Sequence, residues 1–185
     1  MIRRAFRFMG SVVTGSPDEE EEPYPSLVLL LELPIELGRE RVLEVAGQAW
    51  GGPESAASIV REQRGRRWLI SVSEVLFGLS SGRRRYRRRG REANQVRQRV
   101  WDRHRAWLEV DYPDATRMPE TAWPSCYKLL FLMANQLWGE NCLGLYLPAQ
   151  QVTVPNMGDL IGSIRWAGNN GTPLPFLHAP AEKQA

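Results

Sequence analysis

The order of apolar and polar positions predicts a chain in which strands and helices alternate. A nearly continuous apolar run at 26–33, ended by Pro34, is too short for a typical helix and indicates a strand buried on both faces. Residues 74–79 either continue the strand before them or form an edge strand. The other predicted strands span 56–60, 67–73, 106–111, 142–147 and 152–154.

Apolar residues at helical spacing predict four helices. The first covers 39–50, and the third, at 124–138, is apolar almost all round, which is typical of a central core helix. Asn156 is expected to cap the fourth, which is short and ends near Arg165. The second begins near Ala93, and the residues compatible with its apolar face are Ala93, Val96, Val100, Trp101, His104 and Trp107.

This order indicates an α+β fold in which two or three helices pack on a mixed sheet. The first six elements match the ferredoxin-like order βαββαβ, and a C-terminal helix and strand follow them. The chain is expected to begin with a flexible N-terminal arm and acidic linker at 1–25. A single α+β domain at 26–166 follows, with an Arg-rich loop at 80–92, and an extended tail at 167–185 completes the chain.

The composition is that of a folded protein without a disulfide framework. The chain has 185 residues, of which 43% are hydrophobic, and this length can bury a sizeable core. Cys126 and Cys142 lack the spacing of a zinc site and are expected to be buried free thiols. No segment reaches the roughly 18 apolar residues of a membrane span, and the first nine residues lack the apolar stretch of a secretory signal. We therefore expect a cytoplasmic protein without membrane insertion.

Positive charge is concentrated in one segment. Between Arg83 and Arg105, eleven Arg stand against Glu92 and Asp102, a local charge of +9 in a chain whose net charge is +3. Such a run repels itself and is therefore expected to be an exposed loop. The acidic run at 18–22 could lie against this loop and compete with an anionic ligand. The candidate binding residues are Arg83, Arg84, Arg85, Tyr86, Arg87, Arg88, Arg89 and Arg91.

The Arg-rich loop fits two kinds of partner. It could dock on the acidic surface of another protein and steer the encounter, or bind a nucleic-acid backbone while Tyr86 stacks on a base. The chain contains 22 Arg and only two Lys, Lys128 and Lys183. Function could select Arg for its bidentate contacts, but a GC-rich genome would produce the same excess.

His104 and the carboxylates near it in the sequence are the candidates for catalytic residues. His104 could act as a general base beside Glu109 or Asp111, although its place on an apolar helix stripe favours a core histidine. Glu109 and Asp111 project from the same strand face and could hold a divalent cation, but a polar strand face explains the pair as well. The sequence therefore assigns no catalytic residue, metal site or cofactor.

Four stretches resemble a bacterial family of uncharacterised α/β domains. They are 27–33, the helix end at Trp50-Gly51, 104–110 and 142–146. The resemblance implies a fold and a bacterial setting, and it supplies no activity. The Arg tract departs from the family pattern.

Together these observations predict a non-catalytic binding domain that acts through protein–protein contact, in an immunity-type or adaptor-like role. The Arg-rich loop would engage an acidic partner surface, and no small-molecule substrate is expected. A nucleic-acid-binding accessory protein that uses the same loop is the alternative. An enzyme that uses His104 with a nearby carboxylate is the second alternative.

Overall fold

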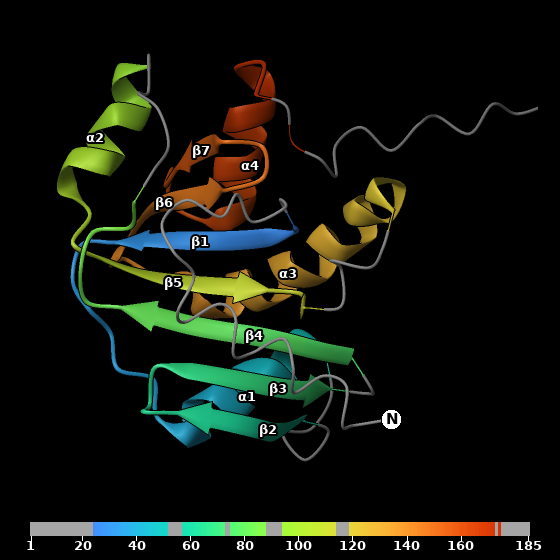
Figure 1. Cartoon of the computed structure of the whole chain (residues 1–185). Helices are drawn as coiled ribbons and strands as arrows, with labels where there is room; N and C mark the ends of the chain where they lie inside the picture. The colour runs from blue at the N-terminus through green and yellow to red at the C-terminus, as the bar shows by residue number, and fades with distance from the viewer. Residues whose placement is uncertain are drawn as a thin grey trace, which may run out of the picture.

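In the computed structural model, the described residues form a seven-stranded antiparallel sheet with four helices (Figure 1). The structure describes residues 24–51, 57–72, 75–87, 94–113, 119–172 and 174. The strands are β1 (Ser26–Leu31), β2 (Ala57–Gln63), β3 (Arg67–Val72), β4 (Val75–Gly82), β5 (Ala106–Asp111), β6 (Cys142–Leu147) and β7 (Val152–Pro155). The helices are α1 (Arg39–Ala49), α2 (Gln95–Arg103), α3 (Trp123–Leu137) and α4 (Leu160–Asn169), and the 3-10 turn η4 (Glu120–Ala122) precedes α3.

The α+β class is confirmed, but the predicted mixed sheet and ferredoxin-like order are wrong. The strand order is β2-β3-β4-β5-β1-β6-β7, and the pairs in this sheet are antiparallel. The prediction failed at β4, which is neither a continuation of β3 nor an edge strand. It lies between β3 and β5 and buries Phe77 and Leu79 in the main core. Three consecutive strands therefore separate α1 from α2.

The main core lies between one face of the sheet and helices α1 and α3, which pack on each other behind the sheet in the view of Figure 1. Strand β1 is buried along its whole length because it runs between β5 and β6. Leu27, Leu29 and Leu31 face this core. Helix α4 packs beside β7 and adds Leu160 and Ala167.

The opposite face of the sheet is divided into two parts. Helix α2 packs against β6 and β7 and closes a second apolar cluster of Val28, Leu30, Val100, Trp101 and Tyr146. The Trp101 indole Nε1 donates a hydrogen bond of 2.9 Å to Thr153 Oγ1 on β7. Helix α2 thus covers the β1-β6-β7 part of this face, whereas the β3-β4-β5 part bears the cavity that is described below.

Two predicted helix ends are corrected by local hydrogen bonds. Helix α2 ends at Arg103 with His104 as its C-cap, so Trp107 belongs to β5 and not to the helix. Helix α4 is capped by Asp159, whose Oδ1 accepts a 2.5 Å bond from the Gly162 N–H. Asn156 instead donates to the Cys142 carbonyl oxygen at 2.6 Å. Helix α4 also continues beyond 166, where the domain was expected to end.

Helix α3 is apolar on one side rather than all round. Its buried residues are Cys126, Tyr127, Leu130, Met133 and Ala134. Lys128 is exposed, and Leu132 is 47% exposed. Among the described helices, none has both the length and the apolar character needed to cross a membrane.

Candidate functional site

The Arg tract begins where β4 ends, and its first residues are tied to neighbouring elements. Arg83 forms an ion pair with Glu36. The Arg85 guanidinium Nη2 donates a 2.7 Å hydrogen bond to the Asp102 backbone oxygen in the last turn of α2. These contacts tie the Arg83 and Arg85 side chains to neighbouring elements.

Tyr86 anchors the tract to the second apolar cluster. Its backbone N–H donates to His104 Nε2 at 3.1 Å. Its ring lies edge-on to Trp107 and Tyr146, with centroid separations of 5.4 and 6.0 Å. The Tyr86 ring therefore packs against the sheet, and the exposed side chains of this part of the tract are arginines.

A second group of arginines lies next to the tract in the turn between β2 and β3. The Ser81 N–H donates to the Arg66 carbonyl oxygen at 2.8 Å, which joins this turn to the end of β4. Within the described part of the chain, no ion pair or hydrogen bond engages the side chains of four exposed arginines, Arg64, Arg66, Arg84 and Arg87. The set that we call the basic end consists of Arg64, Arg66, Arg83, Arg84, Arg85 and Arg87.

The sequence located only part of this surface. Arg83, Arg84, Arg85, Tyr86 and Arg87 lie together because they are consecutive in the chain, and their role in binding stays a prediction. Arg88, Arg89 and Arg91 lie outside the described residues, as does the acidic run at 18–22. Arg64 and Arg66 were missed, although the Arg-Gly-Arg sequence at 64–66 is a turn signal that carries charge.

His104 occupies a structural position. Its ring Nδ1 lies 2.8 Å from the Trp101 carbonyl oxygen, and its Nε2 accepts the Tyr86 N–H. Because Nε2 accepts a hydrogen bond, Nδ1 carries the proton. Burial lowers the pKa of His104 below its ordinary value, and the nearby Arg85 charge lowers it further. His104 does not line the cavity that contains Glu109 and Asp111, so the structure does not bring the three residues of the enzyme hypothesis into one pocket.

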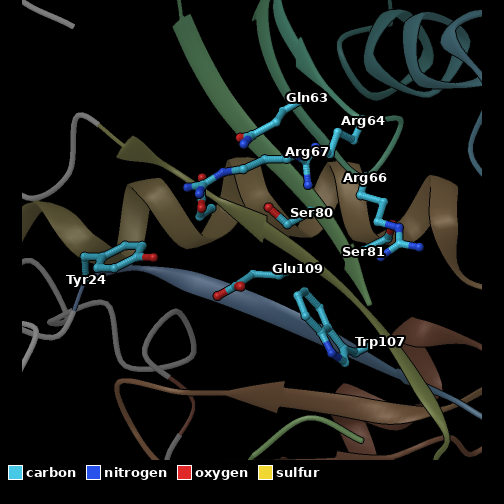
Figure 2. Close-up of a pocket in the computed structure, with 10 residues that line it drawn as sticks. Tyr24, Gln63, Arg64, Arg66, Arg67, Ser80, Ser81, Trp107 and Glu109 are labelled. Carbon is cyan, nitrogen blue, oxygen red and sulfur yellow. The ribbon is translucent and has the colours of Figure 1, made fainter. Parts of the chain in front are cut away.

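A cavity of about 330 Å³ opens on the part of the sheet that bears β3, β4 and β5 (Figure 2). Glu109 and Asp111 both line it, in agreement with their spacing on one strand face. The other residues on its walls and floor are Tyr24, Gln63, Arg64, Arg66, Arg67, Ser80, Ser81 and Trp107. The sequence did not predict this set because most of it comes from four strands, β2 to β5, whose register is set only in the folded sheet.

Small residues on β4 make room for the side chains of β5. Gly78 pairs with Asp111 and Gly82 pairs with Trp107 across the two strands. A Cβ atom at Gly78 would lie 1.9 Å from Asp111 Oδ1, and one at Gly82 would lie 2.3 Å from the Trp107 ring. Ser80 lies between the two glycines and pairs with Glu109. The Asp111 and Trp107 side chains therefore occupy the space above Gly78 and Gly82, and Ser80 and Ser81 are the β4 residues that line the cavity.

Asp111 is a buried carboxyl group in this cavity. It is 5% exposed, and its Oδ1 has no hydrogen-bond partner among the described residues. Burial raises the pKa of Asp111 to about 6, against opposing effects from the Arg67 charge and from a hydrogen bond with the Gly78 backbone. The cavity therefore contains a hydrogen-bond acceptor whose desolvation is only partly compensated.

No family model, curated protein or solved structure matches the chain. The resemblance to a bacterial family of α/β domains stays a prediction, and the two surfaces are interpreted from their own geometry.

Proposed function

We propose that this chain is a non-catalytic binding domain that engages an acidic protein surface through its basic end. The observation that carries this proposal is the presentation of exposed arginines on an anchored backbone. Tyr86 is fixed by a hydrogen bond and two ring contacts, while Arg84 and Arg87 on either side of it are exposed. An immunity-type or adaptor-like role would suit such a domain.

Anchoring favours binding because it reduces the entropy that is lost when the complex forms. A free loop of arginines would have to order both its backbone and its side chains on contact. Here the backbone at 83–87 is already positioned, so ordering of these residues falls mainly on their guanidinium groups. Each group can form paired hydrogen bonds with a carboxylate, and the concentrated charge would accelerate the encounter with an acidic surface.

Nucleic acid is the alternative ligand for the same arginines. Binding of single strands usually combines positive charge with aromatic rings on which bases stack. The Tyr86 ring is half-buried and contacts Trp107 and Tyr146. This packing favours a protein partner over stacking on a base, whereas charge alone would suit either partner.

The proposal is tested by reversing charge at the two exposed positions. A partner captured from the source cells would be purified, and its affinity would be measured by calorimetry for the wild type and for Arg84→Glu/Arg87→Glu. We expect the double variant to bind at least about tenfold more weakly. Arg99→Glu/Arg165→Glu, which changes the same net charge at exposed positions on α2 and α4, should keep its affinity. Equal affinities for all three proteins would contradict the proposal.

Nucleic acid is tested separately by fluorescence anisotropy with labelled random DNA and RNA over a salt series. Binding near physiological salt that weakens steeply with added salt, and that the Arg84→Glu/Arg87→Glu variant loses, would replace the protein-partner proposal with the nucleic-acid one. No binding, or weak binding that the substitutions do not change, is the expected result.

A further inference from the structure

The cavity lies beside the point where the chain enters β1. Tyr24, the first residue that the structure describes, lines it. The Tyr112 N–H donates to the Pro25 carbonyl oxygen at 3.4 Å, which ties this entry to the end of β5. In Figure 2, Tyr24 lies at one end of the cavity and Arg66 at the other. The acidic run at 18–22 precedes Tyr24 by two to six residues, so five consecutive carboxylates stand next to this cavity in the chain.

Two exposed arginines of the cavity carry charges that no described residue balances. Arg64 and Arg66 belong to the turn between β2 and β3, in which the Arg66 N–H donates to the Gln63 carbonyl oxygen at 3.1 Å. Within the described part of the chain, no ion pair or hydrogen bond engages either guanidinium group. Arg67 differs, because its charge acts on Asp111. The turn therefore offers Arg64 and Arg66 to an anion.

The backbone of this turn holds the two arginines in place. Arg64 and Gly65 have φ values of 53° and 61°, and two successive residues in the left-handed region are typical of a tight hairpin turn. Gly, Asn or Asp adopts this region at a lower cost than Arg. The turn thus keeps a charge at Arg64 where another residue would fit the backbone better. An anion that binds here does not have to order the backbone.

The carboxyl groups of the cavity restrict where an acidic ligand can lie. Asp111 is 5% exposed and covers Gly78, so it offers little surface to a ligand. Glu109 lines the cavity on β5 and repels a carboxylate placed beside it. The favourable position for an acidic ligand is therefore at the β2-β3 turn, which a hydrogen bond joins to Ser81.

The acidic run is long enough to reach this turn. The registers of β3, β4, β5 and β1 align one residue from each strand, namely Arg67, Ser80, Glu109 and Val28. Three strand spacings of about 14 Å separate β3 from β1, and Tyr24 lies four residues before Val28, about 13 Å along the strand. The resulting separation of about 20 Å is what six extended residues span. Pro23 favours an extended backbone at Glu22.

We propose that the acidic run at 18–22 binds across this cavity and places its carboxylates at Arg64 and Arg66. A single exposed ion pair contributes little, but a short connection to Tyr24 gives the five carboxylates a high effective concentration at the cavity. Each guanidinium group can form paired hydrogen bonds with a carboxylate. Because Arg64 and Arg66 belong to the basic end, the run would compete there with an acidic partner, a consequence that rests on the proposed function.

Carbodiimide cross-linking tests this contact, because the chain has only two lysines and neither lines the cavity. The reagent joins a carboxylate to a nearby amine, so Arg66→Lys places a reactive amine at the turn and keeps the charge. Arg84→Lys does the same in the Arg tract, and Arg99→Lys does so at an exposed position on α2. Mass spectrometry of the digested full chain measures the links to 18–22. We expect Arg66→Lys to give a yield at least about tenfold above that of each other variant.

Added salt shows whether ion pairs hold the contact. In about 0.5 M NaCl the yield for Arg66→Lys should fall at least about threefold, because exposed charges are screened. The absence of a link, equal yields for the three variants, or a yield that salt leaves unchanged would overturn the proposal. The highest yield for Arg84→Lys would overturn it as well, since the run would then lie at the Arg tract and not in the cavity.

A second measurement tests whether the run covers the two arginines. A fluorescein-labelled hexaglutamate peptide is titrated with the full chain, and its anisotropy is recorded. Glu20→Gln/Glu21→Gln should bind the peptide at least about threefold more tightly than Glu120→Gln/Glu140→Gln, which removes the same charge at exposed positions outside the cavity. Equal affinities for the two variants would mean that the run does not compete for these arginines, against the proposal.

The outcomes separate this proposal from the function of the basic end. If the cross-link fails, the partner experiment with Arg84→Glu/Arg87→Glu still decides the proposed function, since neither residue lines the cavity. If the partner binds that double variant as it binds the wild type, the cross-link of Arg66→Lys still decides where the acidic run lies.

Discussion

Asp111 is a buried carboxyl group, and its raised pKa has a direct consequence for stability. Its pKa is about 6 in the folded chain and 3.8 as its ordinary value. The folded state therefore holds the proton more tightly, and the ionised form opposes folding. Arg64, Arg66, Arg67 and Glu109 are the other charged residues that line the cavity, and the charge of Arg67 only partly offsets the effect of burial.

The corresponding prediction concerns Asp111→Asn, which does not titrate. As pH rises from about 4 to about 6, the wild type should lose up to about 3 kcal/mol of stability relative to this variant. The measurement is urea unfolding of both proteins at several pH values. A stability difference that stays constant across this range would show that the Asp111 carboxyl group is not desolvated as the structure indicates.

Gly78 allows a second prediction at the same scale. Gly78→Ala would place a methyl group 1.9 Å from Asp111 Oδ1, so the carboxyl group or the strand must move, at a cost of about 1–3 kcal/mol. Urea unfolding should show this loss, and it should be smaller when the alanine is introduced into an Asp111→Ala background. Gly139→Ala is the control because no atom lies within 4 Å of the added Cβ. Equal losses in both backgrounds would mean that Asp111 is not the clashing group.

At the scale of elements, strands with regular alternation were predictable and β4 was not. Strand β5 and strand β6 have the predicted boundaries, because β5 largely alternates between buried and partly exposed positions and β6 is a short, nearly continuous apolar run. On β4, Gly78, Ser80 and Gly82 occupy the open face, so the strand lacks both a polar alternation and a strong strand propensity. Ser80, one of the residues that weaken its sequence signal, lines the cavity.

The described start of the Arg tract, residues 83–87, gives a prediction about the Tyr86 ring that helps to anchor it. Tyr86→Ala removes the contacts with Trp107 and Tyr146, so the backbone at 83–87 should open more often. Trypsin, which cleaves after Arg, should then cut the native protein faster at Arg84 and Arg85, as mass spectrometry of the fragments would show.

The control for this cleavage is Tyr112→Ala, which removes a half-buried ring that packs on the main core. Its cleavage at Arg84 and Arg85 should stay close to that of the wild type. If both variants are cut there equally fast, the tract opens through global unfolding and not through the loss of its anchor.

At the scale of the whole molecule, the position of α2 determines which surfaces remain for binding. It covers the β1-β6-β7 part of one sheet face and leaves the cavity on the β3-β4-β5 part. The Arg tract was visible in the sequence because its residues are adjacent in the chain. The cavity was not, because Arg67, Ser80 and Glu109 become neighbours only through the pairing of three strands.

The two buried titratable groups of these regions should affect the whole molecule in opposite directions. Burial lowers the pKa of His104 below 6.5, so its folded form resists protonation and the unfolded chain binds the proton more tightly. The stability that neutral His104 provides is therefore present above pH 6.5 and is lost as pH falls toward its folded pKa. Asp111 acts with the opposite sign, since its contribution becomes less favourable as pH rises toward 6.

We therefore expect His104→Gln and Asp111→Asn to tilt the pH dependence of stability in opposite senses. Relative to the wild type, His104→Gln should lose the most stability at and above pH 6.5 and progressively less in acid, because protonation already removes the acceptor for the Tyr86 N–H. Asp111→Asn should gain the most near neutral pH. Urea unfolding of the three proteins between about pH 4 and 7 measures both trends. The stability of each variant minus that of the wild type is plotted against pH. If the two plots slope in the same direction, one of the two groups is not buried in the charge state that its contacts imply.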